Sequence, residues 1–313
     1  MSENIATRAA YGQTLVELAP TEKNLVVLDA DLSGSTMTKD FSKAYPDRFL
    51  NMGIAEANMV GVAAGLATCG KKPFVNSFAI FSAGRVWEQV RNSVAYPKLN
   101  VKIIGSHGGL SVGEDGATHQ CIEDFAIMRA IPNMTVLCPC DGNEMRAAVR
   151  ALLAYDGPAY MRLGRLAVDT VSLDTGFQIG KGVTLREGKD VTIVAVGMMV
   201  QRALAAADLL AKEGIDARVL DFHTIKPLDE ALLLAAAQET GAIVTSEEHT
   251  ILGGLGGAVA EFLSENCPVP VIRHGVEDQF GRSGQALKVL EFYGLTSEKI
   301  AEKARLAIAR KHK

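Results

Sequence analysis

The segment 106–120 concentrates side chains that could do chemistry. Two of the six histidines of the chain, His107 and His119, lie in it together with Asp115 and four glycines. Histidine and aspartate donate and accept protons in catalysis, and glycine lets a backbone approach a ligand closely. The segment follows an apolar run at 101–105 that predicts a buried strand, and ligands of open α/β sheets bind at the carboxyl ends of strands. The segment is therefore a candidate ligand-binding loop, although an ordinary polar surface loop has the same composition.

A second candidate is Glu56, at the start of a predicted helix of small and apolar residues. A carboxylate in such surroundings needs a partner or a raised pKa. The alternative is a first-turn glutamate that the helix dipole favours.

Both segments resemble a known family. Residues 113–120, GEDGATHQ, resemble the GEDGPTHQ motif of transketolases, which are thiamine-diphosphate enzymes that move two-carbon ketol units between sugars. Ala117 stands where the family usually has proline, which leaves the loop less stiff but removes no functional group. The Gly-Ile-Ala-Glu sequence that ends at Glu56 also resembles the family. The resemblance implies that Glu56 is catalytic and hydrogen-bonds N1′ of the aminopyrimidine of the cofactor.

The resemblance implies roles for further residues. Three would lie at the cofactor: Phe78 and Phe81, which would pack against the aminopyrimidine, and Asp31. Gly84 stands where transketolases have another aromatic residue, so the pocket is expected to be more open there.

Substrate contacts follow from the same resemblance. The phosphate of a sugar phosphate would be held by a cationic, hydrogen-bonding cradle of Arg8, Ser35, His107 and Arg165. Asp115 would read the C2 hydroxyl of the acceptor, and His119 would lie near the reacting carbon and the donor hydroxyls. His107 and His119 are thus expected to be catalytic as well as substrate-binding.

The elements that must position these residues follow an α/β pattern. Strand-like and helix-like runs alternate along the chain, which predicts a doubly wound parallel sheet with helices on both faces. Helical patterns near 5–19, 55–69, 82–95 and 143–154 belong to the first half. We expect a pyrimidine-binding domain over 1–167, a linker over 168–190 and a smaller transketolase C-terminal α/β domain over 191–313. The histidines of the last domain, His223, His249 and His274, belong to no catalytic motif, and its expected roles are dimer contacts and support of the active-site domain.

Composition excludes other classes of protein. The chain of 313 residues has a net charge of −4, which does not favour nucleic acid or an anionic membrane as a partner. It has no run long enough for a membrane span and no signal-peptide pattern at its start. Its five cysteines match no disulfide or zinc framework, so we expect buried, reduced thiols in a cytoplasmic protein.

One expected element is missing. In this superfamily a Gly-Asp-Gly, followed some thirty residues later by asparagine, holds the diphosphate through Mg²⁺ (or Ca²⁺), and no Gly-Asp-Gly occurs here. The chain therefore resembles the C-terminal subunit of a split transketolase. The resemblance implies an N-terminal partner subunit that supplies the diphosphate and metal site, an α2β2 assembly acting on sugar phosphates in the pentose phosphate pathway, and inactivity of the chain alone.

Three alternatives stay open at this point. A 1-deoxyxylulose-5-phosphate synthase shares the Asp-Gly-x-Thr-His-Gln core, but Arg8, His107 and Gly-Glu-Asp-Gly favour a transketolase. The β subunit of a 2-oxoacid dehydrogenase has this size, yet its acid substrates would not need a phosphate cradle. A non-catalytic scaffold subunit is disfavoured by the presence of Glu56, Asp115 and His119.

Overall fold

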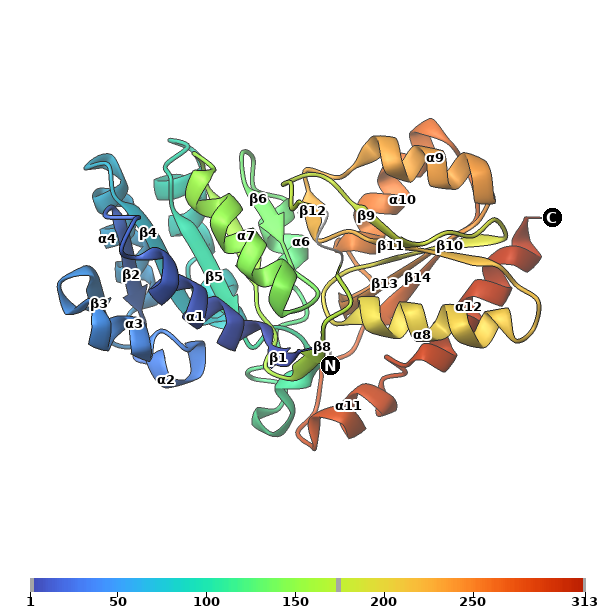
Figure 1. The fold of residues 1–313 in the computed structure, drawn as a ribbon, viewed down its shortest axis with the longest axis horizontal. Helices are drawn as coiled ribbons and strands as arrows, with labels where there is room; N and C mark the ends of the chain where they lie inside the picture. Colours follow the sequence, from blue (N-terminus) through green and yellow to red (C-terminus); the bar gives the residue numbers. More distant parts are fainter. Residues whose placement is uncertain (1–2, 173–175, 312–313) are drawn as a thin grey trace.

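The computed structural model describes residues 3–172 and 176–311, which form two α/β units side by side (Figure 1). The elements of the first are β1 (Asn4–Ala6), α1 (Thr7–Leu18), β2 (Leu25–Asp29), α2 (Ser33–Thr36), α3 (Lys39–Ala44), η1 (Pro46–Arg48), β3 (Phe49–Asn51), α4 (Glu56–Thr68), β4 (Lys72–Phe78), η2 (Phe81–Arg85), α5 (Trp87–Gln89), η3 (Val90–Ala95), β5 (Lys102–Ser106), η4 (Leu110–Asp115), α6 (Asp124–Arg129), β6 (Thr135–Leu137), α7 (Gly142–Ala154), β7 (Ala159–Arg162) and β8 (Ala167–Asp169). Those of the second are β9 (Val183–Arg186), β10 (Val191–Ala195), α8 (Met199–Ala211), β11 (Ala217–Asp221), β12 (Thr224–Lys226), α9 (Glu230–Thr240), β13 (Ile243–Thr250), α10 (Leu255–Asn266), β14 (Val271–Val276), α11 (Ala286–Phe292) and α12 (Ser297–Arg310).

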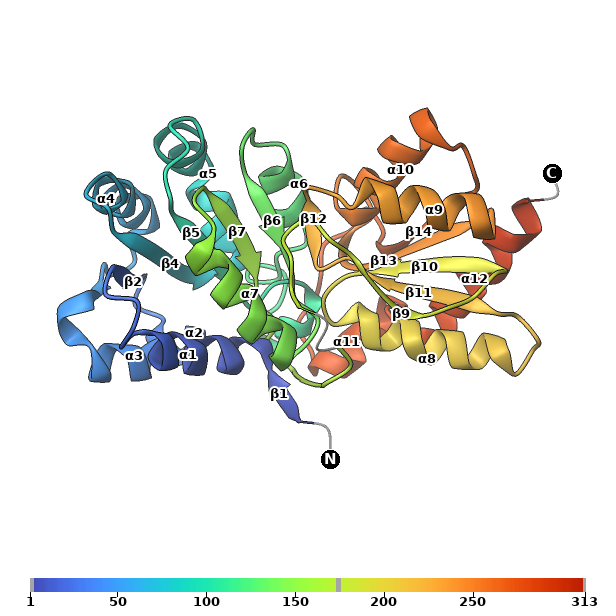
Figure 2. The ribbon, with the colours of Figure 1, turned by 45° about the horizontal axis from the view of Figure 1, so that its top comes forward.

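The first unit is a seven-stranded sheet in the order β12-β6-β7-β5-β4-β2-β3, parallel except for β12. Its strands β2, β5 and β7 are continuous buried runs, as expected where helices cover both faces of a parallel sheet. Helices α1 and α7 pack on one face, and α4, α5 and α6 lie on the other (Figure 2). This confirms the predicted fold class.

The second unit has a five-stranded sheet in the order β14-β13-β10-β11-β9. Strand β9 is antiparallel to β11 and lies within the stretch expected to be a linker. In the same stretch, β8 pairs with β1 near the start of the chain. Strand β12, from the second half, completes the edge of the first sheet by pairing with β6. The two units are therefore joined by sheet hydrogen bonds as well as by side-chain packing.

The helix expected near 82–95 differs from the prediction. The segment forms two turns of π-helix, η2 and η3, with a short α5 between them. The physical reason lies in Gly84, which has low helix propensity and weakens regular α-helical bonding. Turns of π-helix are rare and often mark functional positions, and η2 contains the predicted pocket residue Phe81.

All five cysteines lie in the described part of the chain, and all are free thiols. Cys121, Cys138 and Cys140 are buried as expected, whereas Cys69 is exposed and Cys267 is partly exposed. The expectation of burial is thus wrong for Cys69, which follows the end of α4 at the surface. None of the helices in the described residues is both long and apolar enough to span a bilayer.

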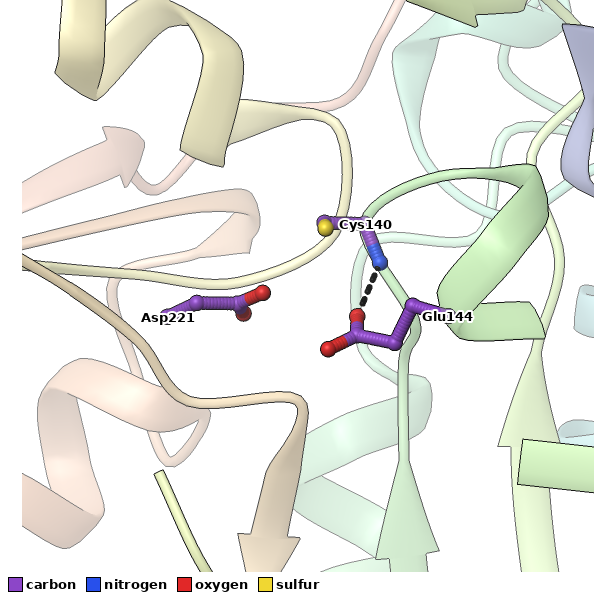
Figure 3. A group of neighbouring side chains, drawn as sticks. All are labelled: Cys140, Glu144 and Asp221. Carbon is purple, nitrogen blue, oxygen red and sulfur yellow. Dashed lines mark hydrogen bonds between the residues drawn. The ribbon is translucent and has the colours of Figure 1, made fainter. Parts of the chain in front are cut away.

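The interface between the units contains a fully buried group of acidic and thiol side chains, Cys140, Glu144 and Asp221 (Figure 3). The backbone N–H of Cys140 donates to Glu144 Oε2 at 2.6 Å, and the two carboxyl groups face each other across the interface. Burial raises the pKa of Asp221 to about 7 and, together with the Asp221 charge, raises that of Glu144 well above its usual range. The raised pKa values keep at least one of these carboxyl groups neutral, which explains how both are buried together.

This pair makes stability depend on pH. The pKa of Asp221 rises from 3.8 in the unfolded chain to about 7 in the fold, so its neutral form stabilises the fold below pH 4 and this contribution is lost as the pH rises to about 7. We expect Asp221→Asn to match the wild type near pH 4.5 and to be more stable than it at pH 8, as measured by denaturant unfolding. Asp216→Asn, at an exposed aspartate, is the control. A difference between wild type and Asp221→Asn that stays constant from pH 4.5 to 8 would contradict the raised pKa of Asp221.

Candidate functional site

The predicted site residues gather at one edge of the first sheet because its strands are parallel. Strands β2, β4, β5 and β7 all run toward this edge, and the loops that follow them contain Ser35, Phe81, His107 and Arg165. The topology therefore brings together residues that lie more than a hundred positions apart in the chain, in the place where open α/β sheets bind ligands.

Glu56 begins α4, and its side chain is 4% exposed. The Nη1 atom of Arg85 donates to both carboxylate oxygens, at 3.1 and 3.3 Å. The same guanidinium lies over the ring of Phe81, with Cζ 4.0 Å from the ring centroid. Glu56 is thus a buried carboxylate with a planar cationic partner, as its apolar helix required. The sequence did not indicate Arg85 as that partner.

Four rings line the site next to Glu56. Phe78 is stacked on His107 with centroids 4.1 Å apart and on Phe81 at 6.1 Å. His119 meets Phe81 edge-on at 5.5 Å. These contacts place both predicted histidines and both predicted phenylalanines in one cluster that would suit a flat heteroaromatic ring.

The residues of the predicted anion cradle also lie close together. Arg8 donates to the backbone carbonyl of Ser35 at 2.8 Å. Arg8 and Arg165 lie near enough to His107 to affect its pKa, which burial first, and then these two cations and His119, lower to about 3. His107 is therefore neutral at pH 7 and would act as a hydrogen-bonding group, while the two arginines supply the positive charge.

Arg165 has partners of its own in this chain, Glu114 at 2.5 Å and the carbonyl of Val112. These contacts hold the Arg165 guanidinium against the segment 106–120, which is called the motif loop from here on. A phosphate group would have to compete with the exposed Glu114 for it.

Two predicted residues, Asp31 and Asp115, are exposed at this edge. Asp31 has a positive φ of 61° and accepts a hydrogen bond from Asn51 at 3.1 Å. The buried Asp29 fixes the loop that contains Asp31. It accepts hydrogen bonds from the backbone N–H of Leu32 and from the hydroxyls of Thr36 and Thr38 at 2.6 to 2.9 Å. Sequence reasoning assigned no role to Asp29, although an aspartate that ends a buried strand is a signal for such a loop anchor.

The motif loop is supported by the second unit. Glu248 of β13 accepts the backbone N–H of Ser111 at 2.5 Å. Gly109 has a φ of 82°, and a Cβ atom there would overlap the carboxyl group of Glu248. Gln120, the last residue of the motif, donates to the carbonyl of Arg282 at 2.9 Å. The C-terminal half therefore fixes the shape of the loop, as its expected supporting role requires.

Arg162 ties these parts together. It is fully buried, binds both oxygens of Asp124 at 2.7 and 2.9 Å, and donates to the carbonyls of Cys121 and Glu248. Burial opposes its charge, and the Asp124 carboxylate outweighs this and raises the pKa of the guanidinium. Arg162 and Glu248 were not indicated by the sequence, because neither lies in a motif.

The histidines of the second unit stay outside the site. His223, His249 and His274 are all buried, and burial lowers the pKa of each to about 4. His249 is stacked on Phe125, and His223 on Phe177, so both are packed as neutral rings.

These residues fit the aminopyrimidine part of thiamine diphosphate. A buried carboxylate at the start of α4 is linked through Arg85 to an aromatic cluster, and the two match the hydrogen-bonding edge and the flat faces of such a ring. They do not fit the diphosphate and its metal. Among the described residues, the one group of three potential metal ligands is Cys140, Glu144 and Asp221, which is buried between the units.

Comparison with known families agrees with this geometry. Residues 3–170 match the family model "Transketolase, pyrimidine binding domain" and residues 180–300 match "Transketolase, C-terminal domain". The chain belongs to the transketolase family. Members of this family depend on thiamine diphosphate.

Three proteins illustrate the relationship. A subunit of the 6-deoxy-6-sulfo-D-fructose transketolase of Clostridium sp. strain MSTE9 is 49% identical over 97% of this chain and 95% of its own. A solved structure described as a split gene transketolase, inactive beta4 tetramer, is 53% identical with a TM-score of 0.92, over 98% of this chain and 99% of its own. The transketolase of Campylobacter jejuni is 27% identical with a TM-score of 0.82, over 96% of this chain but 46% of its own. This chain thus corresponds to about half of a full-length transketolase and to nearly the whole length of one chain of the split-gene protein.

The contact between Gly109 and Glu248 can be tested by adding one methyl group. We expect Gly109→Ala to lower the free energy of unfolding by about 2–4 kcal/mol, because the new Cβ meets a buried carboxyl group at a left-handed φ. The measurement is denaturant unfolding at pH 7. Gly34→Ala is the matched control, since a Cβ there meets nothing within 4 Å. Equal stabilities of the two variants would show that the loop is not held against the second unit.

Proposed function

We propose that this chain is the C-terminal subunit of a split, thiamine-diphosphate-dependent transketolase that transfers a two-carbon ketol unit from a ketose phosphate to an aldose phosphate. The observation that carries the proposal is the buried Glu56 carboxylate, linked through Arg85 to the Phe78–Phe81 cluster, with the Arg8–Arg165 cradle at the same sheet edge. When bound, the cofactor would supply the carbon centre that accepts the ketol unit.

The residues of this chain would divide the remaining work. Glu56 would bind the aminopyrimidine edge and hold a proton at its N1′ atom, as a buried carboxylate can when its water is excluded. Phe78 and Phe81 would pack against the ring. His119, only partly buried, would exchange a proton with a hydroxyl of the sugar, and Asp115 would bind the acceptor's C2 hydroxyl.

A partner subunit is part of the proposal. This chain offers the aminopyrimidine side of a site whose diphosphate and Mg²⁺ would be held by an N-terminal subunit with a Gly-Asp-Gly motif. The inactive tetramer formed by the related split-gene chain supports self-association without activity for this chain alone, and an α2β2 assembly with the partner.

The first experiment mixes this chain with the product of a neighbouring reading frame that encodes a Gly-Asp-Gly protein. We expect ketol transfer from xylulose 5-phosphate to ribose 5-phosphate only in the mixture, with thiamine diphosphate and Mg²⁺ present. Glu56→Gln should reduce kcat by about a hundredfold or more, because a positioned proton-transfer group contributes about 10²–10⁴-fold. Glu88→Gln, at an exposed carboxylate on α5, should leave kcat unchanged. A mixture that binds the cofactor but transfers nothing would refute the substrate assignment, and an active Glu56→Gln would refute the role of Glu56.

The second experiment tests the anion cradle. Arg165→Gln should raise the KM for ribose 5-phosphate by about ten- to a hundredfold, the equivalent of one charge-assisted hydrogen bond, and leave the KM for unphosphorylated ribose unchanged. Arg150→Gln, at an exposed arginine paired with Glu17, is the matched control. A sulfonated ketose should be tried as donor as well, because the related Clostridium subunit belongs to a sulfofructose transketolase and a cationic cradle suits either anion. Equal effects on phosphorylated and unphosphorylated acceptors would contradict the cradle.

A further inference from the structure

Arg85 occupies the space between Glu56 and Phe81. Its Nη1 atom donates to both oxygens of Glu56, and its guanidinium plane covers the face of the Phe81 ring at 4.0 Å. Within the described residues, Arg85 is the one side chain that hydrogen-bonds Glu56. The carboxylate is 4% exposed, whereas the Arg85 side chain is 50% exposed, so the cation reaches in from solvent and covers the acid.

A guanidinium and an aminopyrimidine make the same two kinds of contact. Each is flat, and each has faces that stack on an aromatic ring. Each also hydrogen-bonds a carboxyl group, the guanidinium by donating its N–H groups and the pyrimidine through a proton held between its N1′ atom and Glu56. The contacts that Arg85 makes with Glu56 and Phe81 are therefore those that the proposed function requires of the cofactor ring.

We propose that Arg85 is an internal stand-in for the aminopyrimidine: it occupies the ring's place beside Glu56 and has to leave when the cofactor enters. The proposal rests on the proposed function, because it concerns the same pocket. It adds a residue that controls access to that pocket, where sequence reasoning had noted only the absence of an aromatic side chain at Gly84.

Two features make this exchange possible. A buried carboxylate without a partner is unfavourable, so the empty pocket needs a cation. A half-exposed ion pair contributes little free energy, so a ligand that makes the same contacts and buries more surface can displace it. The guanidinium can rotate out about its own side-chain bonds, and the neighbouring Gly84 is exposed and has no atom within 4 Å of its Cβ position.

The consequence for the chain alone is a pocket that is already filled. Arg85 forms an ion pair with Glu56 and covers the ring of Phe81, so the cofactor ring has to compete with Arg85 for both contacts. The diphosphate contacts of a partner subunit would give the cofactor the additional affinity that this competition demands.

The test uses the isolated chain and a neutral probe, 4-amino-5-hydroxymethyl-2-methylpyrimidine, which is the ring portion of the cofactor and needs neither metal nor partner. We expect Arg85→Ala to bind it about tenfold more tightly than the wild type by calorimetry, because an exposed ion pair and a cation–π contact no longer compete. Arg91→Ala, at an exposed arginine one segment further along that bonds only its neighbour Asn92, should bind like the wild type. Methylguanidinium should compete with the probe in Arg85→Ala.

Two further measurements test whether the gain in binding depends on Glu56 and whether it also occurs in the complete assembly. Adding Glu56→Gln to Arg85→Ala should abolish the gain, since the probe then lacks its carboxylate. In the complete assembly, Arg85→Ala should lower the Kd of thiamine diphosphate by a similar factor. Equal or weaker binding of the probe by Arg85→Ala, or weaker binding of the cofactor in the assembly, would overturn the stand-in. The proposed function is decided separately, by ketol transfer in the wild-type assembly.

Discussion

The site depends on one buried cation. Arg162, at the end of β7, binds the Asp124 carboxylate on both oxygens and donates to the carbonyl of Cys121, directly after the motif loop, and to that of Glu248 in β13. A buried ion pair of this kind loses hydration that only well-placed partners can replace, and removing one partner leaves an uncompensated charge. Four segments from the two halves of the chain are therefore held in fixed positions around Arg162. Ser111 and Glu248 lie beside this network, so the shape of the motif loop follows from it.

This arrangement explains why a half with no catalytic motif matters to the site. The motif loop has glycines at 109, 113 and 116, all with positive φ, and a loop of this kind has little shape of its own. Contacts with the second half determine the shape of the loop. Glu248 lies against Gly109, Ser283 lies against Gly116, and the carbonyl of Arg282 accepts a hydrogen bond from Gln120. The same glycines that let the loop approach a ligand also let the second half approach the loop.

Part of the candidate site is exposed in this chain. Asp31, Asp115 and Arg85 are exposed there, and His119 is partly so. The chain contributes a ring pocket and an anion cradle but, within its described residues, no metal group at that edge. The charged groups proposed to bind ligands form ion pairs within this chain. Arg85 pairs with Glu56 of the ring pocket, and Glu114 pairs with Arg165 of the anion cradle. These pairs give each charged group a partner in the chain alone, and the proposed ligands would compete with them.

The sequence by itself determined the fold class and most of the candidate site. Long buried strands alternating with helices specify a parallel sheet. The resemblance of the motifs to those of transketolases then grouped the expected site residues before their positions were known, namely Phe78, Phe81, His107, His119, Arg8 and Arg165. The tertiary structure alone decided how the charges pair. Arg85, Arg162, Glu248 and the Glu144–Asp221 pair belong to no motif, and each acts through a partner that is 29 to more than 80 positions away or in the other half of the chain. The π-helical turns within 81–95 were not predicted either, because a glycine at 84 lowers helix propensity without specifying which other conformation the segment adopts. Periodicity reports which residues are buried, but the partner of a buried charge depends on which segments meet, and only the packed chain determines that.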